Sequence, residues 1–137
     1  MKILAVDLGR VRTGLAISDQ TEFLATPIGT VTERDRDRLV QYVTDAVREH
    51  GAEKIVVGLP KNMDGSQGES AQNATAFAEQ LKTVTGLPVV LWDERLTTAS
   101  AIGFLNETNV RGKKRKAVVD TVSAVIILQD YLDSNRR

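Results

Sequence analysis

The stretch KILAVDLGRVRTGLAISD, residues 2–19, decides the fold. It begins with an apolar run that ends in an acid at Asp7, which is the pattern of a strand buried on both faces. A short turn with glycines follows, and the side chains then alternate between apolar and polar over residues 13–19. This spacing predicts a hairpin in which a strand at residues 2–8 pairs with a strand at residues 13–19.

Beyond the hairpin, the chain alternates between strands and helices. Hydrophobic periodicity predicts a strand, a helix, a strand, a helix, a strand and two further helices, at residues 24–31, 35–49, 53–59, 66–85, 88–93, 98–107 and 117–133. Pro27 suits an edge position in the third strand. The basic segment 108–116 is predicted to be a loop. The order implies an α/β fold with a mixed five-stranded sheet, helices on both faces, and later strands parallel to the first.

Composition excludes several kinds of chemistry. The 137 residues include no cysteine and one histidine, His50, so thiol catalysis and sites built from several histidines are ruled out. The length predicts a single domain over residues 1–137. No apolar run has the length of a membrane span or the form of a signal peptide, so a cytoplasmic location is expected.

Acids stand at the predicted strand ends. Asp7 closes the first strand, the pair Asp93 and Glu94 closes the fifth, and Asp120 lies in the apolar last helix. Because parallel strands end at one edge of a sheet, these carboxylates can converge there. Such an oxygen site suits Mg²⁺ or Mn²⁺, and two ions can promote cleavage of a phosphodiester. The alternative is that these acids are turn or rim charges, with Asp120 paired to Lys116.

Net charge is zero, but basic residues gather in one place. Five of the six residues from Arg111 to Lys116 are basic, close to Asp120. A basic segment beside a metal site would attract a polyanion. The side chains expected to contact nucleic acid are Arg10, Arg12, Lys61, Asn62, Arg95, Lys113, Lys114, Arg115 and Lys116. The alternating charges of residues 33–38 are interpreted as a solvated helix start with local ion pairs.

Four segments in this order resemble the YqgF (RuvX) family. They are residues Asp7–Asp19, Val57–Pro60, Asp93–Thr98 and Lys113–Asp120, and the resemblance covers essentially the whole chain. The family has a ribonuclease-H-like fold similar to that of the RuvC Holliday-junction resolvase. It is described both as a junction resolvase and as the nuclease that matures the 5′ end of the 16S ribosomal RNA precursor.

The resemblance implies a divalent-metal-dependent nuclease. Carried onto this sequence, it assigns the metal ligands to Asp7, to one of Asp93 and Glu94, and to Asp120; we favour Glu94 for its longer reach. The two-ion site, for Mg²⁺ or Mn²⁺, can remain empty until a substrate phosphate completes it. One feature departs from RuvC-like nucleases, since the fourth strand ends at Gly58–Pro60 without an acid.

Three functions follow as hypotheses. The leading one is hydrolysis of a phosphodiester in the 16S ribosomal RNA precursor, with a structured RNA or a ribosomal particle as partner. The second is cleavage of branched DNA, which junction resolvases carry out as dimers. The third is a catalytically silent RNA-binding module in ribosome assembly. A monomer or weak homodimer, with no membrane partner, is expected.

Overall fold

The computed structural model describes residues 1–60, 68–93 and 112–135, and over residues 112–121 only the course of the backbone. The elements in chain order are β1 (Lys2–Asp7), β2 (Arg12–Ser18), β3 (Ala25–Thr32), α1 (Arg36–His50), β4 (Ala52–Leu59), α2 (Glu69–Thr85), β5 (Val89–Asp93) and α4 (Gly112–Asn135). The five strands form one sheet in the order β3-β2-β1-β4-β5. β1, β2 and β3 pair antiparallel, while β4 is parallel to β1 and β5 to β4, so the predicted mixed sheet is confirmed.

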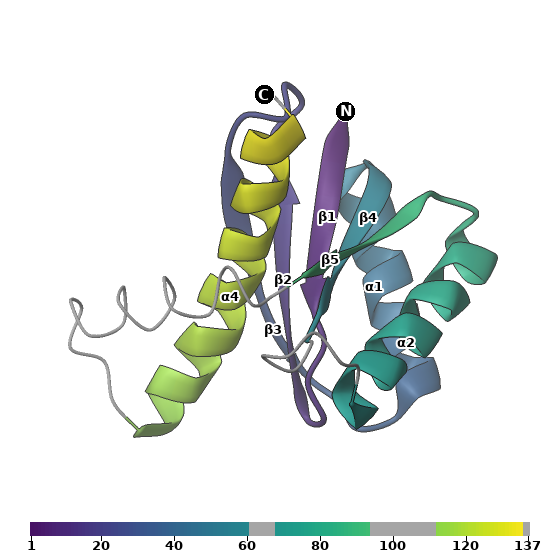
Figure 1. Cartoon of the computed structure of the whole chain (residues 1–137), viewed down its shortest axis with the longest axis vertical. Coiled ribbons are helices and arrows are strands. Elements are labelled where there is room, and N and C mark those ends of the chain that lie inside the picture. Colours follow the sequence, from purple (N-terminus) through teal and green to yellow (C-terminus); the bar gives the residue numbers. More distant parts are fainter. Residues whose placement is uncertain (61–67, 94–111, 136–137) are drawn as a thin grey trace.

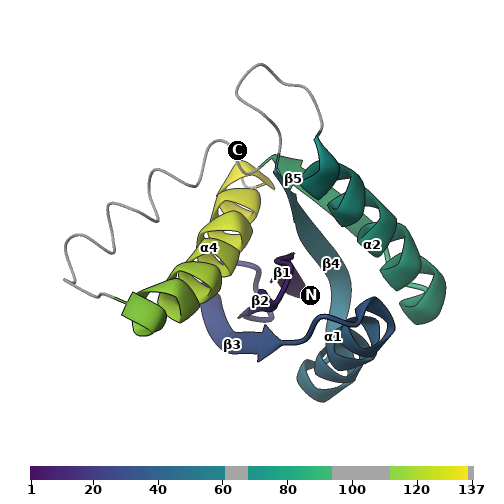
Figure 2. The ribbon, with the colours of Figure 1, turned by 90° about the horizontal axis from the view of Figure 1, so that it is seen from below.

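Helices cover both faces of the sheet, as predicted. α1 and α2 pack on one face and α4 on the other (Figures 1 and 2). Two buried clusters correspond to these layers, one containing residues of α1 and α2 and the other residues of α4. β3 lies at the sheet edge, where Pro27 needs no hydrogen-bonded neighbour on its outer side.

β1 is buried from both sides, which explains its unbroken apolar run. Ile3 and Ala5 pack in the cluster beneath α4, whereas Leu4 and Val6 pack in the cluster beneath α1 and α2. All four are fully buried. Because successive side chains of a strand point to opposite faces, this alternation also assigns the strand's last residue to a face.

The two helices on one face begin differently. The Asp35 side chain caps α1 by accepting the backbone N–H of Arg38 at 3.2 Å. α2 begins at Glu69 with Gly68 as N-cap and has no side-chain cap. The predicted start at residue 66 is therefore wrong, and the first-turn N–H groups of α2 have no capping side chain.

The basic segment is helical where the structure describes it. α4 begins at Gly112, so the predicted loop over 108–116 is wrong from residue 112 onward. Lysine and arginine have high helix propensity, and no proline interrupts residues 112–135, so a run of positive charge here continues the helix. The predicted helix at 98–107 and residues 108–111 lie outside the described residues.

The far end of α4 is held against the β2–β3 connection. The Gln129 side chain accepts the backbone N–H of Ala25 at 3.0 Å and donates to the carbonyl of Phe23 at 3.0 Å. In the same turn, Asp19 accepts N–H groups from Leu24 and Phe23 and the hydroxyl of Thr21. These hydrogen bonds, that from Leu24 foremost, hold the pKa of Asp19 well below its usual range.

Candidate active site at the carboxyl edge of the sheet

The three parallel strands end at one edge, as the sequence predicts. β1 ends at Asp7, β4 at Leu59 and β5 at Asp93. The register pairs Val6 with Val57 and Leu59 with Asp93, so β4 separates the two acids along this edge. β4 itself contributes no carboxylate to the edge.

The two acids of this edge belong to opposite faces by strand alternation. Asp7 follows Ala5 by two residues, and Ala5 packs beneath α4. Asp93 follows Leu91 by two residues, and Leu91 packs against the cluster of α1 and α2. Asp7 is half-buried at the end of its strand, a position open to both the core and solvent.

The turn after Asp7 is too tight for any side chain at Gly9. A Cβ built there would lie 2.0 Å from the carbonyl oxygen of Arg12. The Gly9 N–H donates to Oγ1 of Thr13, which is fully buried, at 3.4 Å. The glycine therefore lets the turn after Asp7 fold closely onto the backbone of Arg12, and Arg10 lies on the same turn.

The remaining predicted site residues lie either outside the described residues or where only the backbone is described. Lys61, Asn62, Glu94 and Arg95 lie outside the described residues. Asp120 and the basic residues Lys113, Lys114, Arg115 and Lys116 lie on α4, where only the backbone is described. Among the described residues, no group of three or more His, Cys, Asp or Glu side chains could hold a metal ion.

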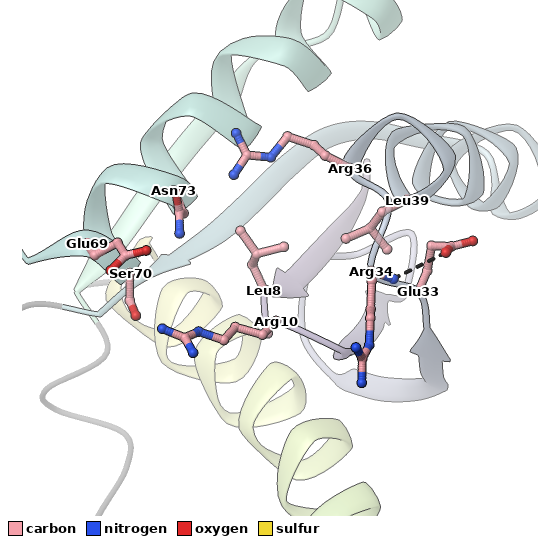
Figure 3. Close-up of a pocket in the computed structure, with 10 residues that line it drawn as sticks. Leu8, Arg10, Glu33, Arg34, Arg36, Leu39, Glu69, Ser70 and Asn73 are labelled. Carbon is pink, nitrogen blue, oxygen red and sulfur yellow. Dashed lines mark hydrogen bonds between the residues drawn. The ribbon is translucent and has the colours of Figure 1, made fainter.

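A pocket that the sequence analysis missed opens beside the same turn. It has a volume of about 340 Å³ and lies between the β1–β2 turn, the start of α1 and the first turn of α2 (Figure 3). Its polar lining includes Arg10, Arg34, Arg36, Ser70 and Asn73. Arg10 was expected at a nucleic-acid surface, but the others were not.

Arg34 and Arg36 do not form the local ion pairs that their sequence suggested. Asp35 caps α1, and Asp37 accepts a hydrogen bond from Gln80 of α2 at 3.1 Å. Within the described part of the chain, the guanidinium groups of Arg34 and Arg36 have neither an ion pair nor a hydrogen bond. The sequence did carry a signal for this pocket. Arg34 and Arg36 flank the capping residue Asp35, at a helix start where negative charge is favoured and positive charge is unusual.

Comparisons with known proteins agree with this architecture. Over 99% of this chain and 96% of the other, the fold is similar to Thermus thermophilus RuvC in complex with a Holliday junction, at a TM-score of 0.64 and 12% identity. It is also similar to the fowlpox virus Holliday junction resolvase, over 98% of this chain and 99% of that one, at a TM-score of 0.58 and 15% identity. The sheet order and these two similarities define the class of fold, which is ribonuclease-H-like α/β.

The particular family follows from the sequence. A family model described as RuvX, Holliday junction resolvase, matches residues 1–134, and the chain belongs to this family. A Listeria monocytogenes protein provisionally named pre-16S rRNA nuclease is 45% identical over 136 residues, which are 98% of this chain and 99% of that protein. Family membership makes the chain a nuclease, a hydrolase of ester bonds, and its partner class nucleic acid.

Two further properties bear on the chemistry. Nucleases with this fold generally use divalent metal ions. In the described residues, no helix is both long enough and apolar enough to cross a bilayer.

Proposed function

We propose that the chain is one nuclease domain, residues 1–137, that uses divalent metal ions to cleave the 16S ribosomal RNA precursor near its 5′ end. Family membership supports the hydrolytic chemistry, and the name of the Listeria relative supports the substrate. In this proposal the protein acts in the cytoplasm, on free precursor or on a ribosomal particle, as a monomer or weak homodimer. The metal ligands are Asp7, Glu94 and Asp120.

The proposal rests on one observation, which is how far along the strand direction each residue of α4 lies relative to the residues of β1. Gln129 binds Ala25, and Ala25 is paired with Ser18. Ser18 lies beside Ile3, whose N–H donates to the Ser18 hydroxyl at 2.7 Å. Gln129 of α4 is thus level with Ile3 of β1.

Starting from Ile3 and Gln129, which lie level with each other along the strand direction, the distance along β1 to Asp7 and the distance along α4 to position 120 are nearly equal. Asp7 lies four residues beyond Ile3, which is about 13 Å at roughly 3.3 Å per strand residue. Position 120 lies nine residues before Gln129, which is about 14 Å at roughly 1.5 Å per helical residue. α4 runs antiparallel to β1 (Figure 1), so both displacements point to the carboxyl edge. Position 120 is therefore expected level with Asp7, on the same face of the sheet.

The helical repeat supports the orientation of Asp120 in this proposal. Ala124, Ile127 and Tyr131 are residues of α4 that are buried in the cluster between this helix and the sheet. Position 120 precedes Ala124 by four residues, so the two share a face of the helix. An acid on that stripe, at the edge where β1 ends, suits a metal ligand.

The alternation of β5 supports Glu94 over Asp93. Val90 and Trp92 pack against the cluster beneath α4, whereas Val89 and Leu91 pack against the opposite cluster. If the alternation continues by one residue, Glu94 belongs to the face of Asp7. The proposal therefore retains Glu94 as ligand and Asp93 as the alternative to be tested.

The donor set fits a hard cation, because carboxylate oxygens are the ligands that Mg²⁺ and Mn²⁺ prefer. Asp7, Glu94 and Asp120 would hold two such ions, which would supply activation of a water molecule and stabilisation of the leaving oxygen of a phosphodiester. The basic side chains hold the polyanion at the edge. Lys113, Lys114, Arg115 and Lys116 occupy the start of α4, upstream of Asp120, while Arg10, Arg12, Lys61, Asn62 and Arg95 flank the strand ends.

The test compares purified wild type with Asp7→Asn on a 5′-extended 16S rRNA precursor, with Mn²⁺, with Mg²⁺ and with chelator. Asp45→Asn is the matched control, because it removes an exposed carboxylate of α1. Asp7→Asn is expected to lower the cleavage rate by about 10²–10³-fold or more, with RNA binding retained. Asp45→Asn is expected to cleave normally.

Further arms separate the alternatives. Loss of activity in Glu94→Gln but not in Asp93→Asn supports Glu94 as ligand; the reverse result transfers that role to Asp93.

Cleavage of a four-way DNA junction in preference to the RNA would replace the substrate proposed here. Full metal-dependent activity of Asp7→Asn would remove the proposed site, and absence of any Mg²⁺ or Mn²⁺ binding would favour an RNA-binding module.

A further inference from the structure

The pocket beside the β1–β2 turn is built by three separate elements. Leu8, Gly9 and Arg10 come from the turn, Arg34 and Arg36 flank the start of α1, and Ser70 and Asn73 come from the first turns of α2. Leu39, which is 3% exposed, lines the pocket together with Leu8. The pocket thus combines an apolar side with a polar rim.

The arginines supply positive charge that no described carboxylate neutralises. Within the described residues, Arg10, Arg34 and Arg36 have no ion pair. Of the two acids in the lining, Glu33 is engaged by the backbone N–H groups of Arg34 and Asp35, at 3.2 and 3.4 Å. Glu69 is the remaining acid, so the three guanidinium groups outnumber the lining carboxylates.

The donors converge from two sides of the pocket. Figure 3 shows the Arg10 guanidinium reaching toward Ser70 and the Arg36 guanidinium reaching toward Asn73. α2 begins next to these side chains, at Glu69, and its N-cap Gly68 supplies no capping side chain. Forked guanidinium donors, a hydroxyl, an amide and first-turn N–H groups that no described side chain caps are the kinds of group that bind phosphate oxygens.

The arginines at α1 have no evident role in stability. Arg36 is the first residue of α1, where the helix dipole disfavours a cation. Arg34 lies just before the cap and is exposed. Two positive charges placed against the dipole, and left without partners in the described residues, are better explained by a ligand than by the fold.

We propose that this pocket binds a phosphate group of the nucleic-acid strand that is cut at Asp7. Leu8–Arg10 follow Asp7 directly, so the pocket and the cleavage edge share one turn but lie on opposite faces of the sheet. A strand crossing the turn presents one phosphate to Asp7 and another to the arginines. Among the residues that the structure describes, no aromatic side chain lines the pocket, which suits the sugar-phosphate backbone better than a stacked base. The proposal rests on the proposed function for the position of the cut.

Binding is measured without cleavage, by fluorescence anisotropy of a labelled single-stranded RNA in chelator at several salt concentrations. Arg36→Gln is compared with Arg48→Gln, which removes the same charge from the exposed far end of α1. Arg36→Gln is expected to weaken binding about tenfold and to reduce the salt slope by about 0.7, the effect of one phosphate contact. Arg48→Gln is expected to change neither. Thermal melting checks that both variants fold; by the helix dipole, Arg36→Gln should melt slightly above and Arg48→Gln slightly below wild type, opposite to the order of their expected RNA affinities.

The RNA is used with a 5′-phosphate and with a 5′-hydroxyl. If the penalty in Arg36→Gln is confined to the 5′-phosphorylated RNA, the pocket holds the strand terminus; an equal penalty on both means an internal phosphate. Equal Kd and salt slope for Arg36→Gln and Arg48→Gln would overturn the proposal. The outcome is independent of the nuclease proposal, because Asp7→Asn cleavage and Arg36→Gln binding are separate measurements.

Discussion

Replacing Gly9 by alanine should separate the positioning of the active edge from the stability of the fold. The added Cβ would lie 2.0 Å from the Arg12 carbonyl oxygen, whereas real Cβ contacts are essentially never shorter than 3.0 Å. The turn must therefore shift by at least 1.0 Å, the difference between these two distances. The atoms that meet both belong to the backbone or lie next to it, so no flexible side chain can absorb the shift.

That displacement falls two residues after Asp7 in the chain, in the turn that joins β1 to β2. A misplacement of about 1 Å in a catalytic group can reduce the rate about 100-fold. We expect Gly9→Ala to lower single-turnover cleavage of the RNA precursor by about that factor, at saturating Mn²⁺. Circular dichroism and thermal melting check that the fold persists, because Gly9 lies in an exposed turn outside the core.

Gly51→Ala is the matched control. Gly51 ends α1 in the left-handed region at φ 70°, and a Cβ there meets nothing within 4 Å. It should lose about 1–2 kcal/mol of unfolding free energy through backbone strain, with cleavage unchanged. Wild-type cleavage by Gly9→Ala would refute the reasoning, as would equal losses of activity in the two variants.

Two further predictions concern the core and the β2–β3 turn. Phe77→Ala, at a fully buried position of α2, should lower the free energy of unfolding in urea by about 3–5 kcal/mol. Val84→Ala, at a position 54% exposed on the same helix, should lower it little. Equal urea midpoints for the two variants would contradict the packing of Phe77. The pKa of the Asp19 carboxyl should lie, by NMR titration, below its usual value of about 4, because the hydrogen bonds donated to it by Leu24, Thr21 and Phe23 are stronger to the charged form than to the neutral form. Its contribution to stability is present above about pH 4 and lost as the pH falls toward the lower folded pKa, so wild type should lose more stability than Asp19→Asn between about pH 5 and pH 2; parallel losses would contradict the turn's role.

The secondary structure could be predicted from the sequence with two errors among the described residues, the basic segment and the start of α2. β1 and β4 are buried on both faces and show continuous apolar runs, and the glycine-bearing turn after Asp7 marked the hairpin. The segment at Lys113–Lys116 was misread because positive charge was taken as a sign of a loop, although lysine and arginine are good helix formers. The start of α2 was predicted too early, at residue 66, because local sequence does not show where a helix without a side-chain cap begins; the helix starts at Glu69 with Gly68 as N-cap.

The arginine pocket could not be read in the same way. Arg10 is separated from Arg36 by two strands and from Ser70 by a further helix and strand, so only packing brings them to one cavity. The alternating charges of residues 33–38 predict ion pairs between neighbours in the sequence. In the structure, Asp35 is taken by a helix cap and Asp37 by Gln80, which leaves the arginines to the pocket.

By itself, the sequence determined the strands, most of the helices and the placement of Asp7 at the end of β1, since side-chain periodicity is a local property of the chain. Tertiary structure alone decided that Asp7 and Asp93 belong to opposite faces, that Gln129 sets the level of α4, and that three arginines border one cavity. These depend on register and packing between segments far apart in the chain, and local patterns carry no information about such distances.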